Sequence, residues 1–208
     1  ACGHDAHTAM LLGVAHVLSA VREQLPGTVV FVFQPAEERP PPGEDGGAQL
    51  LLREGGLDAP RPDAIFALHA APEYPVGTVA WRSGGAMASS DRMRIVVHGQ
   101  QTHAAKPWDG VDPIAAASQI VLALQAIPGR QTDARNPAVI SIGAIHGGVR
   151  NNIIPDQVEL LGTIRSLDPE QRLELHERVR RTATALAESS GARAEVEIDV
   201  ARGYPVTW

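Results

Sequence analysis

The chain has 208 residues, of which 44% are hydrophobic and 20% charged, and it carries a formal net charge of −6. This length predicts one or two domains, and the hydrophobic fraction suffices for a buried core, which excludes a disordered chain. The acidic balance argues against nucleic acid as a partner, and no apolar run reaches the roughly 18 residues that crossing a membrane requires. The single cysteine excludes an intrachain disulfide and favours a reducing, cytoplasmic location.

The two ends of the sequence indicate a piece of a longer enzyme. The chain begins ACGHD, without an initiator methionine or a signal-like stretch, and it ends at Trp208 within an expected strand entry. We therefore expect a site built from distant segments to be incomplete within these residues.

The first part of the chain predicts alternating helices and strands. Apolar residues at helical spacing predict an amphipathic helix over 6–22, and a short helix is expected near 48–54. Apolar runs at 28–33 and 64–68 predict strands buried in a parallel sheet, and 78–81 predicts a third strand. This alternation is typical of an α/β layer.

From about residue 89 the pattern is that of a different domain. The expected elements are a strand at 92–97, a helix at 113–124, strands at 138–144 and 157–165, a helix at 169–188 that Asp168 caps, and a strand at 194–200. This β-α-β-β-α-β order predicts a ferredoxin-like antiparallel sheet with two helices on one face. The fold class is therefore α/β, with a domain at 89–200 inserted into another that comprises 1–88 and is re-entered at 201–208.

Residue types that bind metals follow the predicted strands of the first domain, where open α/β sheets place ligand sites. Cys2 and His4 are two residues apart, so both point the same way in an extended segment, and a thiolate with an imidazole suits Zn²⁺. The alternative is a small buried cysteine beside a helix that Asp5 caps.

Two further clusters complete this set. Glu37 and Glu38 follow the apolar run at 28–33, and adjacent carboxylates repel each other unless a cation or a proton compensates. One would bind metal while the other accepts a proton from water, and a solvated acidic turn is the alternative. His69 closes the run at 64–68, where a structural role is the alternative. Taken together, the three clusters favour a metal centre.

The second domain carries its own polar set. His103 lies between its first strand and its first helix, Asn152 precedes the strand at 157–165, and Arg165 ends that strand. An amide and a guanidinium suit recognition of a carboxylate, although spacing alone favours a turn asparagine and a solvated arginine. The remaining histidines are assigned surface or structural roles: His16, His98, His146 and His176.

Six segments together resemble a known family. They are ACGHDAHTAMLLG (1–13), FQPAEE (33–38), ALHAAP (67–72), THAAKPWDGVDPI (102–114), NNIIPD (151–156) and GTIRSLD (162–168). In this order they resemble the metallopeptidases that include aminoacylases, carboxypeptidases and hippurate hydrolase. Within these, the branch they resemble is the N-acyl-amino-acid amidohydrolases, such as hippurate hydrolase and indole-acetyl-amino acid hydrolases. The set spans nearly the whole chain and is far more specific than any single motif.

The resemblance implies an amidohydrolase of N-acyl amino acids with two divalent metal ions. Its catalytic domain would be zinc-peptidase-like (α/β/α), and its inserted ferredoxin-like domain would serve as a lid and dimerisation surface, so a homodimer is expected. Carried onto this sequence, Cys2 would bridge the metals, His4, Glu38 and His69 would be further ligands, and Glu37 would be the general base. These ligand types permit Zn²⁺, Mn²⁺, Ni²⁺ or Co²⁺.

The lid residues also acquire roles from the resemblance. His103 would reach the active site of the partner subunit and stabilise the oxyanion, while Asn152 and Arg165 would hold the substrate carboxylate. The lid motif reads HAAKPW where HAA-x-PH is more usual, and the loop at 39–43 is Pro-rich, so substrate preference stays open. The family's last metal-binding histidine has no counterpart before Trp208.

Two other functions compete with this one. A cysteine hydrolase would use Cys2 as nucleophile with His4 or His7 as base, which leaves the acidic pair and His69 without a role. A binding or dimerisation module would act through 89–200, without activity and without metal.

Overall fold

The computed structural model describes residues 2–38 and 44–208, except for the side chains of 201 and 202. The chain divides into two compact units, unit 1 at 1–80 and unit 2 at 81–208. Unit 2 begins before the expected boundary at 89, because the backbone of this segment bonds within it: Ala86 N–H donates to the Thr207 carbonyl at 2.7 Å. The assignment of 201–208 to the first domain stays a prediction.

The described part of unit 1 is built from helices and loops. It contains α1 (His4–Ala20), a single 3-10 turn (Arg22–Gln24) and α2 (Gly47–Arg53). The two α-helices agree with the helices expected at 6–22 and 48–54 to within two residues. No residue of α1 is buried, so the apolar side chains that predicted this helix are exposed or only half-buried.

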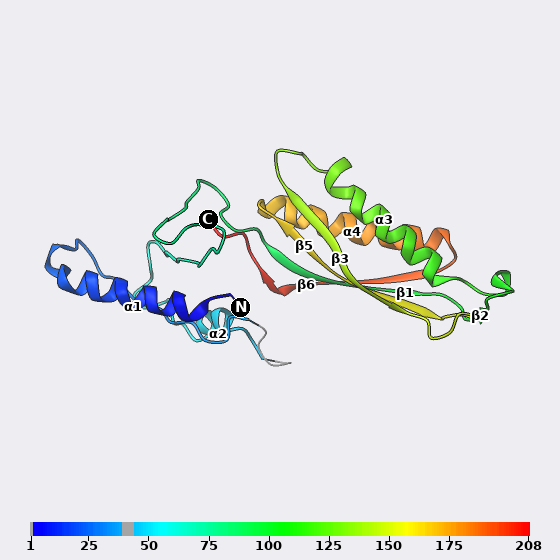
Figure 1. Ribbon diagram of the computed structural model, residues 1–208, viewed down its shortest axis with the longest axis horizontal. Helices are drawn as coiled ribbons and strands as arrows, with labels where there is room; N and C mark the ends of the chain where they lie inside the picture. Colours follow the sequence, from blue (N-terminus) through cyan, green and yellow to red (C-terminus); the bar gives the residue numbers. More distant parts are fainter. Residues whose placement is uncertain (1, 39–43) are drawn as a thin grey trace. The chain divides into compact units, whose positions relative to one another are not determined.

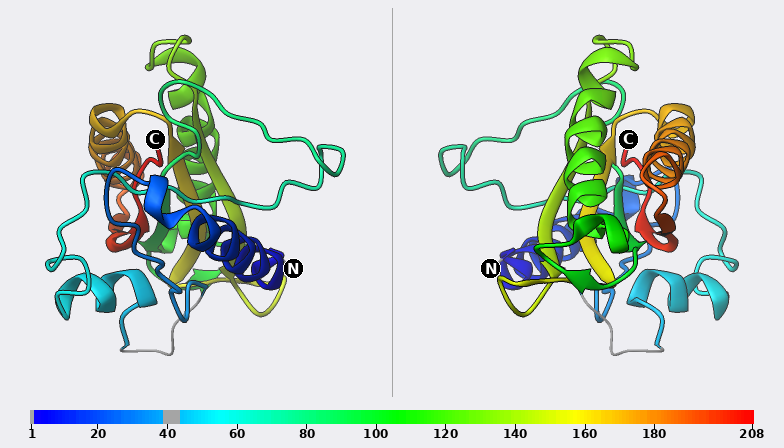
Figure 2. Two further views of the ribbon diagram at one scale, coloured as in Figure 1. Left: turned by 90° about the vertical axis from the view of Figure 1, so that its left-hand side faces the viewer. Right: turned by 90° about the vertical axis from the view of Figure 1, so that its right-hand side faces the viewer.

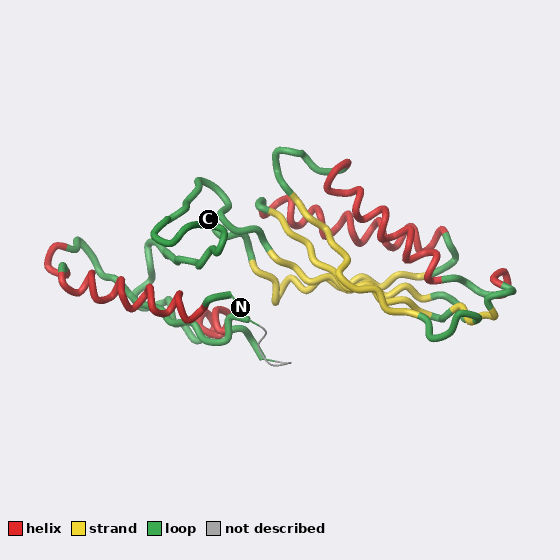
Figure 3. Tube along the Cα trace, viewed as in Figure 1, coloured by secondary structure: helices red, strands yellow, loops and turns green. Residues whose placement is uncertain are grey.

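The strands expected at 28–33, 64–68 and 78–81 are not formed, and this prediction was wrong. Figure 3 shows helix and loop in this part of the chain. Val30 is 54% exposed and Phe66 is 93% exposed. A strand forms only where a neighbouring segment completes its hydrogen bonds. No segment among 2–38 and 44–80 completes these hydrogen bonds. An apolar run in the sequence predicts burial, but it does not show whether a partner strand is present.

Unit 2 has the expected β-α-β-β-α-β order of its main elements, with two short additional strands. The elements are β1 (Ser90–His98), β2 (Thr102–His103), a 3-10 turn (Pro107–Asp109), α3 (Pro113–Arg130), β3 (Ala138–Gly147), β4 (Ile153–Ile154), β5 (Gln157–Ser166), α4 (Pro169–Ser189) and β6 (Arg193–Tyr204). Helix α3 extends beyond the expected end at 124 and includes Pro128. Complete burial of Ile127 in the last turns offsets the hydrogen bond that this proline cannot donate.

Both helices of unit 2 begin at an Asp-Pro pair. The Asp112 carboxylate accepts hydrogen bonds from the backbone of Ile114 at 2.8 Å and Ala115 at 3.2 Å. The expected cap at Asp168 is confirmed, since its carboxylate accepts from Gln171 N–H at 2.8 Å. In each case the proline occupies the first helical turn, where its missing N–H costs no hydrogen bond.

The four long strands form one antiparallel sheet in the order β3-β5-β1-β6. Helices α3 and α4 lie side by side on one face of this sheet (Figures 1 and 2). The core between helices and sheet consists mainly of aliphatic side chains, including Ile95, Val97, Ile120, Leu124, Leu160, Ile164, Leu175 and Val179. Arg94 on β1 forms ion pairs with Glu159 on β5 and Glu197 on β6. Within the described residues, no helix is both long and apolar enough to span a membrane.

Candidate metal centre

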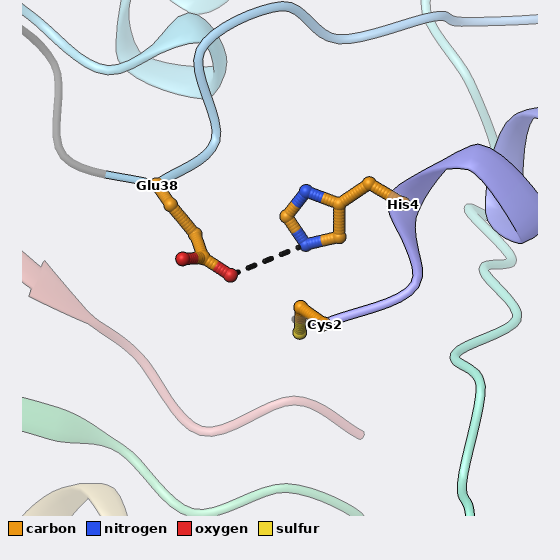
Figure 4. Close-up of side chains that lie close together, drawn as sticks. All are labelled: Cys2, His4 and Glu38. Carbon is orange, nitrogen blue, oxygen red and sulfur yellow. Dashed lines mark ion pairs between the residues drawn. The ribbon is translucent and has the colours of Figure 1, made fainter.

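Five side chains of unit 1 converge at the start of α1. Cys2, His4 and Glu38 each offer a ligand atom, and these three atoms lie within 4.8 Å of one another (Figure 4). His4 Nε2 is 3.5 Å from Glu38 Oε1 and 3.5 Å from Glu37 Oε2. Cys2 Sγ is 3.3 Å from His69 Nε2. The structure thus brings together all five residues of unit 1 that the sequence singled out.

The backbone conformation that brings Cys2 and His4 together differs from the expected one. Gly3 has a φ of 79°, which glycine adopts readily, and α1 begins directly after it at His4. Cys2 and His4 therefore meet across a tight turn and not along an extended segment. Asp5 does not cap the helix but lies in its first turn, where a negative charge suits the helix dipole.

A second turn presents the two carboxylates. Ala36 has a φ of 46°, a left-handed conformation that costs a non-glycine residue about 1–2 kcal/mol. The N–H of Gly47, at the start of α2, donates to the Ala36 carbonyl at 3.2 Å. A Cβ at Gly47 would collide with the carbonyl of Pro35. Close packing of α2 against this turn therefore holds Glu37 and Glu38 toward His4.

The hydrogen bonds of His69 leave one of its nitrogens available as a ligand. His69 Nδ1 lies 2.7 Å from the carbonyl oxygen of Ala70. A carbonyl only accepts, so Nδ1 carries the proton and Nε2 keeps its lone pair. That lone pair faces the Cys2 sulfur. Orientation of one imidazole nitrogen by a backbone carbonyl is common for histidines that bind metals.

His7 is the residue of this cluster that sequence reasoning did not place in a metal centre. Its Nε2 accepts a hydrogen bond from the N–H of Ala70 at 2.8 Å, and its ring centroid lies 4.5 Å from that of His69. Partial burial, followed by the neighbouring imidazoles of His69 and His4, lowers the pKa of His7 and favours this neutral, accepting form. The three-residue spacing of His4 and His7 on one helical face was the available signal.

The carboxylates oppose ionisation of the cysteine. The pKa of the Cys2 thiol is raised, first by partial desolvation and then by the hydrogen bond and negative charge of Glu38. The charge of Glu37 makes a further contribution. A nucleophilic cysteine requires a lowered pKa, so this environment disfavours the cysteine hydrolase. A divalent cation would reverse the balance, because it attracts the thiolate and both carboxylates.

The cluster fits a divalent metal ion by geometry and by donor type. Ligand atoms at about 2.0–2.3 Å from a tetrahedral ion lie about 3.3–3.8 Å apart. The separations between His4 and Glu38, at 3.5 Å, and between Cys2 and His69, at 3.3 Å, fall in this range. A sulfur, imidazole nitrogens and carboxylate oxygens suit borderline ions such as Zn²⁺ better than Mg²⁺ or Ca²⁺.

In unit 2 the structure places His103 beside Asn152. His103 on β2 pairs with Ile153 on β4, and the N–H of Ala104 donates to the Asn152 carbonyl at 3.0 Å. His103 Nδ1 accepts from the N–H of Ala105 at 3.0 Å, so the proton of a neutral ring is on Nε2. Both side chains are exposed, which leaves this imidazole N–H available as a donor.

Arg165 lies near the far end of β5, in the four-stranded sheet. It is eight positions after Gln157, the first residue of β5, and a strand rises about 3.3 Å per residue, which separates these two positions by about 26 Å. Asn152 precedes Gln157, close to β2 and β4. A single copy of unit 2 therefore cannot place Asn152 and Arg165 on the same carboxylate.

Comparison with known proteins gives consistent matches along the whole chain. The profile of Peptidase family M20/M25/M40 matches residues 1–208. N-acetylcysteine deacetylase of Bacillus subtilis is 44% identical over 195 residues, covering 94% of this chain and 50% of the relative. Thermostable carboxypeptidase 2 of Saccharolobus solfataricus is 42% identical over 209 residues, covering 100% of this chain and 51% of the relative.

A solved structure agrees with these relatives. The YXEP protein of Bacillus subtilis, described as a dinuclear metal-binding peptidase, superposes with a TM-score of 0.74 at 40% identity. The match covers 99% of this chain and 48% of that one. The chain thus spans about half the length of the curated relatives that it matches.

Proposed function

Because this chain belongs to Peptidase family M20/M25/M40, we propose that it is a metal-dependent hydrolase of the amide bond in N-acyl amino acids. The observation that carries the proposal is the convergence of Cys2, His4 and Glu38 within 4.8 Å, with Glu37 next to His4. Names of two relatives, the N-acetylcysteine deacetylase and the carboxypeptidase, support this class of substrate.

Cys2, His4, Glu38 and His69 would hold a pair of divalent ions. The central position of Cys2 supports this, because its sulfur belongs to the three-atom group with His4 and Glu38 and also contacts His69. The dinuclear description of the solved relative supports the number of ions, while Zn²⁺, Mn²⁺, Ni²⁺ and Co²⁺ all remain candidates. When bound, such ions supply Lewis acidity and lower the pKa of water toward neutrality.

Glu37 would be the general base. It lies beside the donor set through its 3.5 Å approach to His4, and it follows the strained Ala36 in the turn that α2 supports. In the reaction, its carboxylate takes the proton of the attacking water and then delivers it to the leaving amine. The carbonyl carbon thereby exchanges its bond to nitrogen for one to oxygen, and the products are a carboxylic acid and a free amino acid.

Unit 2 would act as the ferredoxin-like lid. The N–H at His103 Nε2 would donate a hydrogen bond to the tetrahedral oxyanion. One such donor lowers the activation free energy by about 3 kcal/mol. Asn152 and Arg165 would hold the substrate carboxylate. Asn152 precedes β5 and Arg165 lies near its far end, and this separation supports a site completed by two subunits, with His103 and Asn152 from one and Arg165 from the other.

We place the homodimer contact on the β3 edge of the sheet. β3 is the last strand on its side, so its outer backbone groups are open to another strand. Next to it lie exposed apolar side chains of α3 and β3: Ile114, Leu122, Val139 and Ile145. Sedimentation velocity should show a dimer that Leu122→Glu dissociates, and a monomeric wild-type protein would contradict the assignment.

A cytoplasmic location, supported by the single cysteine, is part of the same proposal.

The test of the general base is Glu37→Gln. Turnover of N-acetyl amino acids by the metal-supplemented protein should fall by about 10²–10⁴-fold, because glutamine cannot accept the proton. Metal content measured by elemental analysis should stay near the wild-type value. Glu23→Gln, an exposed substitution elsewhere in unit 1, is the matched control. Retention of most activity by Glu37→Gln would remove Glu37 from this role.

The same preparations decide between the competing functions. A cysteine hydrolase would keep its activity after treatment with a chelator. A binding or dimerisation module would contain no metal and hydrolyse no substrate in the wild-type form. The metal-dependent hydrolase should lose activity to the chelator and recover it when divalent ions are restored.

A further inference from the structure

A cavity of about 390 Å³ opens on the helix-free side of the sheet in unit 2. We propose that it is the subsite for the amino-acid side chain of the substrate, and that it selects a positively charged side chain. This inference rests on the proposed function, because it takes Asn152 as a contact of the substrate carboxylate.

The position of the cavity relates it to the lid residues. Gln101 and Ile153 line its wall. Gln101 is two residues before His103, and Ile153 directly follows Asn152 and pairs with His103 in the short β2–β4 ladder. The α-carboxylate and the side chain of an amino acid branch from one carbon. A substrate whose carboxylate is held at Asn152 would therefore direct its side chain into the adjoining cavity.

The charges of the wall determine which side chain fits. Glu159, Asp156 and Arg94 line the cavity. Arg94 Nε donates to Glu159 at 2.6 Å, while its Nη1 lies 3.4 Å from Glu197 outside the wall. One cation is thus shared between two glutamates, and Asp156 adds a further negative charge. The cavity is therefore acidic overall and favours an ammonium or guanidinium group.

Partial burial strengthens this preference. The side chain of Glu159 is 29% exposed, and His146 on β3 lies opposite it in the sheet. A charge in such a recess is screened by salt less than one on an open surface. Backbone at Gly147 and Gly148 also lines the wall.

The experiment compares three substrates of similar length: Nα-acetyl-lysine, the uncharged Nα-acetyl-norleucine and the anionic Nα-acetyl-glutamate. Wild-type protein should have the lowest KM for the lysine compound, by about fivefold relative to norleucine, as expected for one partly exposed charge contact. Glu159→Gln and Asp156→Asn should each remove most of this preference.

Glu195→Gln is the matched control. Glu195 lies on the same sheet, pairs with His98 and Arg193, and does not line the cavity. It should retain the wild-type preference. Equal KM values for the three substrates in the wild type, or equal effects of all three variants, would overturn the proposal.

A binding measurement separates this proposal from the proposed function. If no N-acyl amino acid is hydrolysed, the function fails, and Nα-acetyl-lysine is then titrated into the same protein while the amide signals of Gly147 and Gly148 are followed by NMR. Shifts at these two glycines that Glu159→Gln abolishes and Glu195→Gln retains support the subsite. Their absence overturns it.

Discussion

The hydrophobic core cluster lies entirely in unit 2, between Met93 and Ala192. Among the described residues of unit 1, Gly47 alone is buried. The candidate metal ligands have the opposite distribution, since Cys2, His4, Glu38 and His69 all belong to unit 1. Aliphatic side chains hold unit 2 together, each contributing about 1.5–3 kcal/mol on full burial. Unit 1 instead positions its side chains by turns and backbone hydrogen bonds.

This difference has a consequence for mutations. Ala70 orients His69 through its carbonyl and His7 through its N–H, and Gly47 supports the acidic turn through Ala36. Such contacts set directions of side chains but bury little apolar surface. Substitutions in unit 1 should therefore change ligand binding more than stability, and core substitutions in unit 2 should do the reverse.

A pair of leucines on helices gives the largest expected contrast. Leu124 of α3 is fully buried, whereas Leu12 of α1 is 58% exposed. Leu124→Ala should lower the free energy of unfolding of unit 2 by about 3–4 kcal/mol, since it removes buried methyl groups and leaves a cavity. Leu12→Ala should change the free energy by about 0.5 kcal/mol or less. Hydrogen exchange measures both effects, at the β1 and β5 amides for Leu124→Ala and at the α1 amides for Leu12→Ala.

These two variants are informative in either direction. Similar losses for Leu124→Ala and Leu12→Ala would mean that α1 buries its apolar stripe in solution. The contrast between the units would then be wrong, even if the metal site were correct.

Asp91 gives a smaller effect through a polar contact. This carboxylate is fully buried on β1 and accepts hydrogen bonds from Arg172 at 2.5 and 2.8 Å and from His176 at 2.9 Å. Asp91→Asn should cost about 3 kcal/mol, because it leaves the Arg172 charge without its partner inside the protein. Chemical denaturation followed by circular dichroism measures this loss. Glu174→Gln, an exposed change on the same helix as Arg172, is the control.

The effect of Asp91→Asn should depend on pH. Burial alone would raise the pKa of Asp91, but the hydrogen bonds of Arg172 and His176 and their charges outweigh it and lower the pKa below the ordinary 3.8. A carboxyl with a lowered folded-state pKa stabilises the fold above its unfolded-state value and loses this contribution as the pH falls. The free energy of unfolding of the wild type should therefore exceed that of Asp91→Asn most above pH 3.8. In stronger acid the two free energies should approach each other. A difference in free energy of unfolding that does not change with pH would contradict this contribution of the ionised Asp91.

The buried cluster around Asp91 also shows what the sequence does not reveal. His176 was assigned a surface or structural role, and only the fold brings it from α4 to Asp91, 85 positions away. The main elements of unit 2 were nonetheless predictable, because Val158, Leu160 and Ile164 alternate with other residues along β5 and both helices begin at Asp-Pro. These signals are local, and they hold although β1 pairs with β5 and β6, which are distant from it in the sequence.

Unit 1 shows the opposite relation between pattern and structure. The residue types Cys2, His4, Glu37, Glu38 and His69 identified the cluster, although the strands expected to carry them are not formed. The left-handed turn at Gly3 has no signal beyond the glycine itself. The chemistry of donor atoms was thus more predictable than the backbone that presents them.

The smallest expected effect is on unit 2 when the proposed metals are removed. Chelation, or Cys2→Ser, should lower the metal content of the protein, because each weakens the donor set of unit 1. The free energy of opening measured by hydrogen exchange at β1 and β5 should change by about 0.5 kcal/mol or less. Ligand binding stabilises only the part of a structure that must be folded to bind the ligand. Ser19→Ala on α1, away from the ligands, controls for substitution in this unit. A large change in the exchange of β1 and β5 on chelation would show that the two units unfold together, and the separation between chemistry and packing would not hold in solution.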